Sequence, residues 1–357
     1  MPLKVSLSIA ISAMNAFGIK QSDYRPLPTQ TGYRNCVVPL DPITSSLPKL
    51  CLIFYKNEPR ILPKIKLANQ VSNNLAERGW PTRHTVGDHS RILVITLAAK
   101  PHYCCLYNYL PGTTIAWEDY TSHHLKLMGQ ALGFLHRDLL NFSQNIQSIS
   151  SNECLNLKDK LNDLYNYFVR IDVLQAVEQK LKLQVHLKEF RSFLPLLEWL
   201  RQHRSHQLIH LDFVRGNLLF ESLHTSTART SPFSSCYLKD SKQTYFISGI
   251  LDFEKVSLGA IELELARCLA FLLVDCERYP PSTIFKSFLL SGYTKRSCHS
   301  LPNLQLIKPL IQLYLLIDFY HFLLHNPYED LIFNHHYQNT VKLLNPRLIS
   351  PLQSCYK

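Results

Sequence analysis

An aspartate and an asparagine stand five positions apart in the stretch HLDFVRGN, residues 210–217, which lies between two apolar runs. A second stretch, ISGILDFEK at residues 247–255, presents Asp252 after a run of mostly apolar residues. Phosphoryl transfer needs side chains of these types, because it requires a carboxylate near the acceptor hydroxyl and oxygen ligands that hold magnesium against the phosphates. The spacing of Asp212 and Asn217 would let one residue face a substrate and the other a metal ion.

The elements that must position these side chains are strands. The runs QLIHLDF (207–213), NLLFE (217–221) and TYFISGILDFE (244–254) carry the apolar and aromatic residues that are typical of strands. The last two runs are expected to pair as a hairpin, which would bring Asn217 and Asp252 together. Residues 222–244 between them are rich in Ser, Thr and Lys, and this composition predicts an enlarged hairpin loop without a catalytic role.

The rest of the chain shows two kinds of periodicity. Apolar runs at 35–40, 49–56, 90–98 and 103–110, with one helical run at 64–79 that ends on a glycine, predict a small sheet carrying one helix. Later apolar residues recur at helical spacing, and the first such stripe is formed by Leu125, Met128, Leu132 and Leu135. Helices are therefore expected up to about residue 200, with a break at Pro195, and again from about residue 261. Residues 1–20 are predicted to form an amphipathic first helix rather than a signal peptide.

The composition indicates a folded, cytoplasmic protein. Hydrophobic residues make up 46% of the 357 residues, and the longest apolar runs stop well short of the roughly 20 residues that a membrane span requires. The ten cysteines include no CxxC pair, which favours reduced and mostly buried thiols over a zinc ribbon or a disulfide framework. The net charge of +11 is spread along the chain without a basic block, which disfavours nucleic-acid binding but leaves it as an alternative.

These motifs resemble those of the aminoglycoside phosphotransferase and choline kinase superfamily, small-molecule kinases with a protein-kinase-like fold. The family's HGDxxxxN pattern stands here as His210-Leu211-Asp212 and Asn217, at the spacing of the protein-kinase catalytic loop. Its IDFG or IDWE metal motif stands as residues 251–254, its GDPxxDLA helix start as GAIELELA at 259–266, and YNYLPGTTI at 107–115 resembles its hinge. The resemblance covers nearly the whole chain.

The resemblance implies an α+β, two-lobed fold, with a small antiparallel sheet and a leading helix at 1–107, a hinge at 108–112 and a larger, mainly helical lobe at 113–357. It implies ATP and Mg²⁺ as cofactors, a nucleotide and a small-molecule acceptor as partners, and an active site in the cleft between the lobes. The sequence does not indicate an oligomeric state.

The resemblance also assigns roles to single residues. Asp212 would be the base or the residue that orients the acceptor hydroxyl, and Asn217 and Asp252 would hold the metal ion. Backbone groups of Asn108, Tyr109 and Leu110 would meet the adenine. Glu264 replaces the aspartate that braces the catalytic loop, His210 is expected to be structural, and Glu254 either contacts the metal or solvates the loop.

The first lobe departs from the family pattern at two positions. The strand lysine or arginine that binds the phosphates should fall near Ile53, and the helix glutamate that pairs with it near 68–70, where no acid occurs. Lys56 is the candidate replacement, but strand alternation turns it to the opposite face unless the strand is bulged or shifted in register. Either ATP is held in a modified way, or the alignment of the first lobe with the family is wrong. The alternative to an active kinase is a non-catalytic nucleotide or ligand binder on the same fold.

The acceptor is predicted from charge. From residue 281 to the end, three acids (Asp318, Glu329 and Asp330) stand against seven lysines and arginines, which disfavours a polycationic aminoglycoside. A neutral or anionic small alcohol of the homoserine, amino-alcohol or sugar type is expected, with no membrane or nucleic-acid partner. An aromatic cage for a choline-type cation is an alternative, although helix packing explains the aromatic residues as well. Zinc is disfavoured for the histidine groups, which lack a nearby acid or cysteine: His203, His206 and His210, and His321 with His325.

Overall fold

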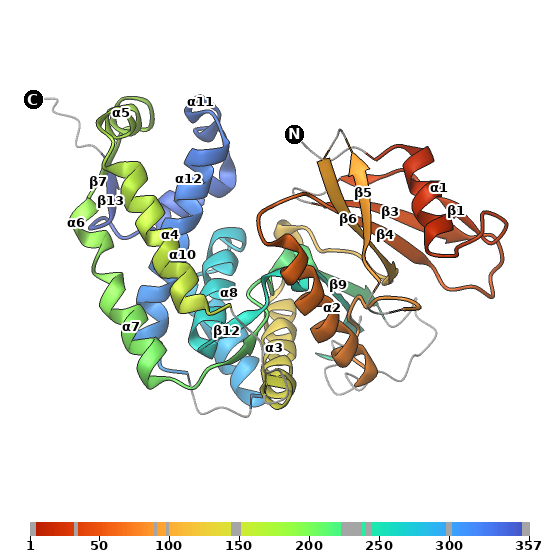
Figure 1. Ribbon diagram of the computed structural model, residues 1–357. Coiled ribbons are helices and arrows are strands. Elements are labelled where there is room, and N and C mark those ends of the chain that lie inside the picture. The colour runs from red at the N-terminus through yellow and green to blue at the C-terminus, as the bar shows by residue number, and fades with distance from the viewer. Residues whose placement is uncertain are drawn as a thin grey trace, which may run out of the picture. The chain divides into compact units, whose positions relative to one another are not determined.

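The computed structural model describes residues 5–31, 35–88, 91–97, 100–143, 151–222, 238–239, 244–297 and 302–351. The chain divides into two compact units: residues 1–114 with 216–256, and residues 115–215 with 257–357 (Figure 1). The first unit therefore includes the 216–256 segment, which the boundaries drawn from the sequence assign to the C-terminal lobe. The division falls inside HLDFVRGN, between Arg215 and Gly216.

The first unit is built on an antiparallel sheet in the order β1-β3-β4-β6-β5, with β2 paired to β3. Its strands are β1 (Tyr24–Pro26), β2 (Gln30–Thr31), β3 (Asn35–Pro42), β4 (Leu50–Tyr55), β5 (Leu93–Leu97) and β6 (Lys100–Asn108). All six side chains of β4 are buried, because this central strand is covered on both faces. The sheet predicted from the sequence is confirmed, with each long strand within a few residues of its predicted run.

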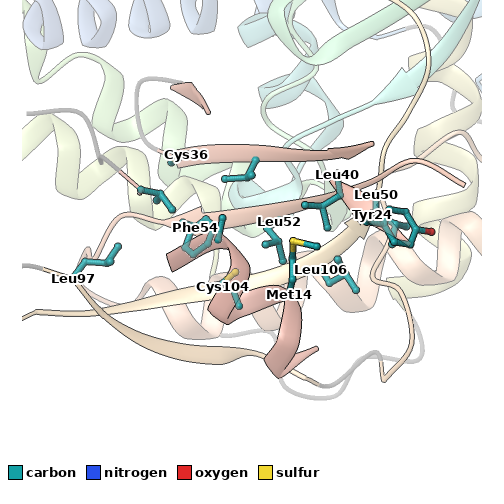
Figure 2. Packing of buried hydrophobic residues seen from close by; sticks show 14 residues of the cluster. Met14, Tyr24, Cys36, Leu40, Leu50, Leu52, Phe54, Leu97, Cys104 and Leu106 are labelled. Carbon is teal, nitrogen blue, oxygen red and sulfur yellow. The ribbon is translucent and has the colours of Figure 1, made fainter. Parts of the chain in front are cut away.

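Two helices cover opposite faces of this sheet. Helix α1 (Leu7–Ala16) packs on the face that carries Leu50, Leu52 and Phe54, and Figure 2 shows its Met14 beside Leu52 and Leu106. Helix α2 (Ile61–Glu77) places Ile65 in the cluster on the other face, with Cys51, Ile53 and Tyr55. The alternation of side chains along β4 separates the two clusters.

A smaller sheet completes the first unit. Strands β9 (Leu218–Ser222) and β11 (Thr244–Ile250) pair antiparallel, with β10 (Leu238–Lys239) on the outer edge of β11. The register shifts between Ile247 and Gly249, which marks a bulge. The predicted hairpin is confirmed, while most of the 222–244 segment lies outside the described residues.

The second unit is mainly helical. Two short antiparallel strand pairs, β8 with β12 and β7 with β13, accompany its helices. Figure 1 shows α4, α7 and α10 side by side. Its described elements are η1 (Trp117–Asp119), α3 (Ser122–Ser143), α4 (Glu153–Phe168), α5 (Ile171–Ala176), η2 (Val177–Leu181), β7 (Leu183–Val185), α6 (Leu187–Phe190), α7 (Phe193–His203), β8 (Gln207–Ile209), β12 (Ser257–Gly259), α8 (Ile261–Asp275), α9 (Pro281–Ile284), η6 (Phe285–Leu290), η7 (Tyr293–Lys295), α10 (Leu304–His325), α11 (Tyr328–Leu331), α12 (His335–Leu343) and β13 (Ile349–Pro351).

The predicted break lies just before Pro195, because α6 ends at Phe190 and α7 starts at Phe193. Pro195 lies in the first turn of α7, which starts at Phe193, and proline is tolerated there because the first-turn N–H groups have no partner within the helix. The chain leaves the helical path earlier, at Lys182, whose φ of 55° is left-handed and which leads into β7. The stripe of apolar residues on α3 is confirmed as core, since all four of its side chains are fully buried.

Helix α10 bears on the expectation that no apolar run is long enough to cross a membrane. At 22 residues it is long and apolar enough to cross a membrane by length and composition, although it contains Lys308 and Asp318. A helix in the core of a folded unit passes the same test, and 61% of its most apolar window is buried. It packs against α8, with Leu310, Leu313 and Leu316 fully buried.

Candidate active site

Asn217 and Asp252 lie at the same end of the β9–β11 hairpin in the first unit. Ile250 at the end of β11 pairs with Leu218 at the start of β9, and the N–H of Leu251 donates to the carbonyl of Asn217 at 2.9 Å. The hairpin thus brings the two predicted metal ligands together, as the sequence predicts. Asp252 has φ 57° and ψ 71°, in the left-handed region that aspartate tolerates better than most residues.

Arg83 reaches the same end of the hairpin. Its Nη2 lies 2.6 Å from Oδ1 of Asp252, and its side chain is only 12% exposed while that of Asp252 is 40% exposed. The backbone positions it, because the N–H of Ile250 donates to the carbonyl of Pro81 at 2.8 Å and the N–H of Arg83 donates to that of Ile250 at 3.4 Å. None of the sequence motifs includes Arg83.

The charges of Arg83, Asp252 and Glu254 influence one another. Burial opposes the charge of Arg83, but Asp252 and further neighbours outweigh it and raise the pKa of Arg83 above its usual value. Burial and then the charge of Asp252 raise the pKa of Glu254 to about 7, although Arg83 acts in the opposite direction. Glu254 lies in the short helix η5 (Phe253–Lys255), which packs against α2. The arginine therefore compensates two carboxyl groups.

No lysine or arginine stands on β4 itself. Ile53 is 1% exposed and lies in the cluster on the α2 face of the sheet. Lys56 is exposed one residue beyond the end of the strand. The pairing of β4 with β3 and β6 runs without interruption from residue 50 to 55, so these pairs contain no bulge that would turn Lys56 toward the face of Ile53.

A neutral hydrogen-bond chain occupies the place on α2 where an acid is missing. Asn69 is buried, and its Oδ1 accepts a hydrogen bond from Tyr107 Oη at 2.6 Å. The hydroxyl groups of Tyr107 and Tyr55 are 2.7 Å apart. The guanidinium of Arg83 lies 5.8 Å from the centre of the Tyr107 ring, within the range of a cation–π interaction.

The segment after β6 is fixed to the rest of the first unit. The N–H of Asn108 donates to the carbonyl of His84 and that of Tyr109 to the carbonyl of Lys49. Among the three predicted adenine-contacting residues, Leu110 is the one whose N–H donates to no atom of the described residues. Gly112 has φ 102° and lies against the β9–β11 hairpin, where Thr113 and Phe220 exchange backbone hydrogen bonds.

In the second unit, Glu264 braces the loop that carries Asp212. Its carboxylate is fully buried and accepts hydrogen bonds from the N–H of His210 at 2.9 Å, the N–H of Leu211 at 2.8 Å and Nε2 of His136 at 2.8 Å. Burial alone would raise the pKa of Glu264, but the hydrogen bond from His136 and the nearby positive charge lower it. This brace holds Leu211 at φ 61°, a strained conformation for a residue with a β-carbon.

His210 supports the loop without facing a substrate. It is fully buried, and its Nδ1 accepts a hydrogen bond from the N–H of Asp212 at 3.1 Å. The ring stands edge-on to Phe213. These contacts fit the structural role predicted for this histidine.

One face of α8 holds the rest of the loop. Arg267 Nη2 lies 3.2 Å from Oδ1 of Asp212, and Cys268 Sγ donates to the carbonyl of Phe213 at 3.2 Å. Two turns after Arg267, Asp275 accepts from Arg215 Nε at 3.2 Å. Residues that share a helix face three and four positions apart thus contact successive parts of one loop.

A pocket of about 450 Å³ lies beside Arg215 in the second unit. His336 on α12 contacts Asp275 at 3.4 Å and Asp318 at 3.1 Å. Burial would lower the pKa of His336, but these two acids raise it to about 9. The pocket is lined by Trp117, Arg215, Val274, Asp275, Phe333, Asn334, His335 and His336.

The donor atoms at the hairpin end fit a hard divalent cation. Asn217 and Asp252 offer amide and carboxylate oxygens, the ligand types that magnesium takes. Within the described ranges no three His, Cys, Asp or Glu side chains are grouped closely enough to hold a metal ion. A cation at Asn217 and Asp252 would therefore complete its shell with other oxygens, as magnesium does with phosphates and water.

Comparison with known proteins identifies the fold. No family model matches this chain, and neither does any curated protein. Among solved structures, it aligns with an amicoumacin kinase in complex with AMP-PNP, Ca²⁺ and Ami at a TM-score of 0.59 and 13% identity, covering 91% of this chain and 90% of that one. It aligns with a choline kinase from Cryptosporidium parvum Iowa II at a TM-score of 0.53 and 12% identity, covering 98% and 99%.

A third structure, the GDP complex of an aminoglycoside 2′-phosphotransferase-IIIa mutant, aligns at a TM-score of 0.54 and 12% identity, covering 96% and 97%. These alignments span almost the whole of each chain. This protein therefore has the kinase-like fold of the small-molecule phosphotransferases, the fold that its motifs imply.

Proposed function

We propose that this protein belongs to the aminoglycoside phosphotransferase and choline kinase superfamily and transfers a phosphoryl group from ATP, with Mg²⁺, to a hydroxyl of a small molecule. The observation that carries the proposal is that the β9–β11 hairpin brings Asn217 and Asp252 to one end, while Asp212, five residues before Asn217 in the chain, lies in a loop braced by Glu264. These side chains are of the types that phosphoryl transfer requires, oxygen ligands for a metal ion and a carboxylate for the acceptor hydroxyl.

Each functional group has a defined task in this proposal. Asn217 and Asp252 would hold the cation, which neutralises phosphate charge when it is bound. Asp212 orients the acceptor hydroxyl and accepts its proton as the oxygen attacks the terminal phosphorus of ATP and the bond to the leaving ADP breaks. The N–H of Leu110, which has no acceptor in the described part of the protein, is the candidate donor to adenine.

Glu264 makes the position of Asp212 reproducible. Two of its three hydrogen bonds fix the backbone of the two residues before Asp212, and Nδ1 of His210 accepts a hydrogen bond from the N–H of Asp212 itself. The carboxylate of Asp212 is held by buried, hydrogen-bonded neighbours, so it needs little reorganisation when the acceptor binds. Arg267 completes this support from the side of α8.

The charges in the second unit support a neutral or anionic acceptor. Arg267 adds a positive charge directly beside Asp212. The pocket beside Arg215 contains Asp275, but Arg215 and His336 already pair with it. A polycationic acceptor would find no unpaired carboxylate among the described residues that line this pocket, so hydroxy-acid, amino-alcohol or sugar-like acceptors fit better.

A cytoplasmic location is part of the proposal. Seven cysteines are free and buried in the described part of the chain, and burial raises the pKa of Cys51 to about 11, which keeps that thiol protonated and unreactive. Reduced thiols of this kind suit a compartment in which disulfides do not form.

An ADP-release screen tests the proposal. The protein would be incubated with ATP and Mg²⁺ and with matched panels of hydroxy acids, amino alcohols, neutral sugars and aminoglycosides. We expect acceptor-dependent ADP release from one of the first three panels. Asp172→Asn, at an exposed acid on α5, serves as the control for Asp212→Asn. Release that is equal with and without every acceptor, or that survives in Asp212→Asn, would contradict the assignment.

The alternative function is nucleotide or ligand binding without catalysis. The observation that favours it is the 2.6 Å contact of Arg83 with Asp252, because a guanidinium already compensates the carboxylate that a metal would use. A thermal-shift assay with ATP separates the two functions. The enzyme requires a stabilisation that depends on Mg²⁺ and disappears in Asp252→Ala while the variant still folds. A metal-independent stabilisation without turnover would identify a binding protein.

A further inference from the structure

We infer that Arg83 is the residue that binds the phosphates of the nucleotide in this chain, replacing the strand cation that β4 lacks. This inference rests on the proposed function and names a residue that the sequence motifs do not indicate. It assigns to the segment after α2 a task that neither Ile53 nor Lys56 can perform from its observed position.

The position of Arg83 is the first argument. Transfer of a phosphoryl group requires positive charge beside the phosphates, and a metal ion held by Asp252 would draw those phosphates to the end of the β9–β11 hairpin. Arg83 is the cation that the described part of the first unit places in contact with Asp252. Two backbone hydrogen bonds join the 81–83 segment to Ile250, which lies two residues before Asp252 in the chain.

The free donors of Arg83 are the second argument. A guanidinium has five N–H donors in a rigid fork that matches the oxygens of a phosphate. Arg83 uses Nη2 for Oδ1 of Asp252, and its Nε and Nη1 donate to no atom of the described residues. Because the side chain is largely buried, its charge is screened less by water than that of an exposed lysine.

The surroundings of Arg83 explain why the missing acid on α2 is not needed. A strand lysine would need an acidic partner to hold its flexible side chain, whereas Arg83 is held by Asp252 and by the face of Tyr107. Asn69, which occupies the region of α2 where the acid is absent, fixes the Tyr107 hydroxyl instead. The loss of the lysine and of the acid is thus a single, charge-balanced change.

The geometry also leaves Asp252 able to serve two partners. Arg83 contacts Oδ1, and Oδ2 has no partner within the described residues. A carboxylate accepts through both oxygens, so one oxygen can meet the guanidinium while the other faces a cation. Asp252 would then hold Arg83 and the cation close enough for both to neutralise charge on the same phosphates.

Nucleotide binding by four variants tests the inference. Arg83→Met removes the charge, Arg83→Lys keeps the charge but not the fork, and the double variant Ile53→Lys/Arg83→Met moves a cation to β4 on the same face of the sheet. Arg78→Met is the matched control, because Arg78 is exposed five residues away at the end of α2. Calorimetric dissociation constants would be measured for ATP with Mg²⁺ and for adenosine, and melting temperatures would confirm folding.

We expect Arg83→Met to weaken ATP binding about 10- to 100-fold, the range for one charge-assisted hydrogen bond, and to leave adenosine binding unchanged. Arg83→Lys should be intermediate, the double variant should regain part of the affinity, and Arg78→Met should match the parent protein. If Arg83→Met does not fold, the comparison of ATP with adenosine in Arg83→Lys decides.

Two results would overturn the inference: equal ATP affinity in the parent and Arg83→Met, or an equal loss for ATP and adenosine, which indicates a structural role. A parent protein that binds no nucleotide overturns the inference and the proposed function together. A parent that shows phosphate-dependent binding sensitive to Arg83 but no transfer to any acceptor keeps the inference and overturns only the enzymatic function.

Discussion

Each unit of this protein presents one aspartate of the candidate site beside an arginine, but the two pairs are built differently. Asp212 in the second unit pairs with Arg267 on α8, the helix that also carries Glu264, and both partners are about 15% exposed or less. Asp252 in the first unit pairs with Arg83, which is 169 residues away in the chain. The side chain of Asp252 is 40% exposed.

Asp212 is therefore held in rigid surroundings, whereas Asp252 is accessible to ligands. The loop around Asp212 is fixed by hydrogen bonds to one helix, so its geometry depends on buried contacts that no ligand replaces. The carboxylate of Asp252 faces outward and is compensated by a side chain with unused donors, so ligands can compete for it or share it. The first arrangement suits positioning of an acceptor, and the second suits binding of phosphate and metal.

The largest effect is expected on catalysis, from a substitution of Asp212. Asp212→Asn should lower kcat about 1,000-fold, within the range for loss of a general base, while ATP affinity stays near that of the parent. Steady-state kinetics and calorimetry on the same preparation check both parts. A variant that loses ATP binding to the same degree would show that the two aspartates do not have separate tasks.

Glu264→Gln should destabilise the second unit by about 3 kcal/mol, because the buried carboxylate accepts from His136, His210 and Leu211, and an amide group turns a donor toward one of them. Urea unfolding measures the loss, with Glu189→Gln on the exposed side of α6 as the control. Equal stability of the two variants would mean that the brace is not needed.

Gly112→Ala should destabilise the first unit by about 2 kcal/mol. Its φ of 102° is unfavourable for alanine, and the new β-carbon would lie 2.9 Å from the carbonyl oxygen of Phe220 and against Ser248. Gly18→Ala is the matched control, since Gly18 also has a positive φ of 79° but open space around its β-position. Thermal unfolding of both variants isolates the clash, which is absent if they melt together.

Arg267→Met should raise the KM for an anionic acceptor about tenfold and leave the KM for ATP unchanged, because the lost charge stands beside Asp212. Arg83→Met is expected to do the converse, because it should weaken the binding of ATP and not that of the acceptor. Arg201→Met on the surface of α7 is the control. If both substrates respond equally to Arg267→Met, the division of tasks between the two arginines is wrong.

The smallest effect concerns pH. The pKa of His336 is raised to about 9 by Asp275 and Asp318, so its protonation stabilises the fold fully below its ordinary pKa of 6.5, and this stabilisation is lost as the pH rises through 9. We expect a loss of about 1 kcal/mol between pH 6.5 and 9.5, reduced because the side chain is partly exposed. In His336→Gln this part of the pH dependence should vanish in urea titrations.

Much of the fold follows from local patterns. The strands, the helix that ends just before Gly79, the hairpin and the stripe on α3 can be predicted because periodicity and turn residues act over a few positions. The brace by Glu264 was predicted from the resemblance of GAIELELA at 259–266 to the family's helix start, and local patterns alone did not indicate it. Pro195 predicted the helix break to within a few residues but not that the new helix starts before it, because a proline in a first turn and a proline in a helix interior have the same sequence signature.

The partner of Asp252 was not predictable in this way. Arg83 joins Asp252 through the parallel bridge of Thr82 with Ile250, a long-range pairing that leaves no periodic trace in either segment. Asn69 had a usable signal, since it falls on the buried face of α2 with Ile65 and Ser72, and a polar residue on an apolar stripe indicates a hydrogen-bonding task. Predicting which residue it bonds requires the sheet.

The buried thiols of the sheet give the first unit its own reporter of opening. Burial raises the pKa of Cys51 on β4 and of Cys105 on β6 to about 11, and only a thiolate reacts readily with alkylating reagents. At neutral pH these two sulfurs can be labelled only in molecules whose strands have separated. The labelling rate therefore reports how often the sheet opens. A nucleotide that binds this unit should lower that labelling rate.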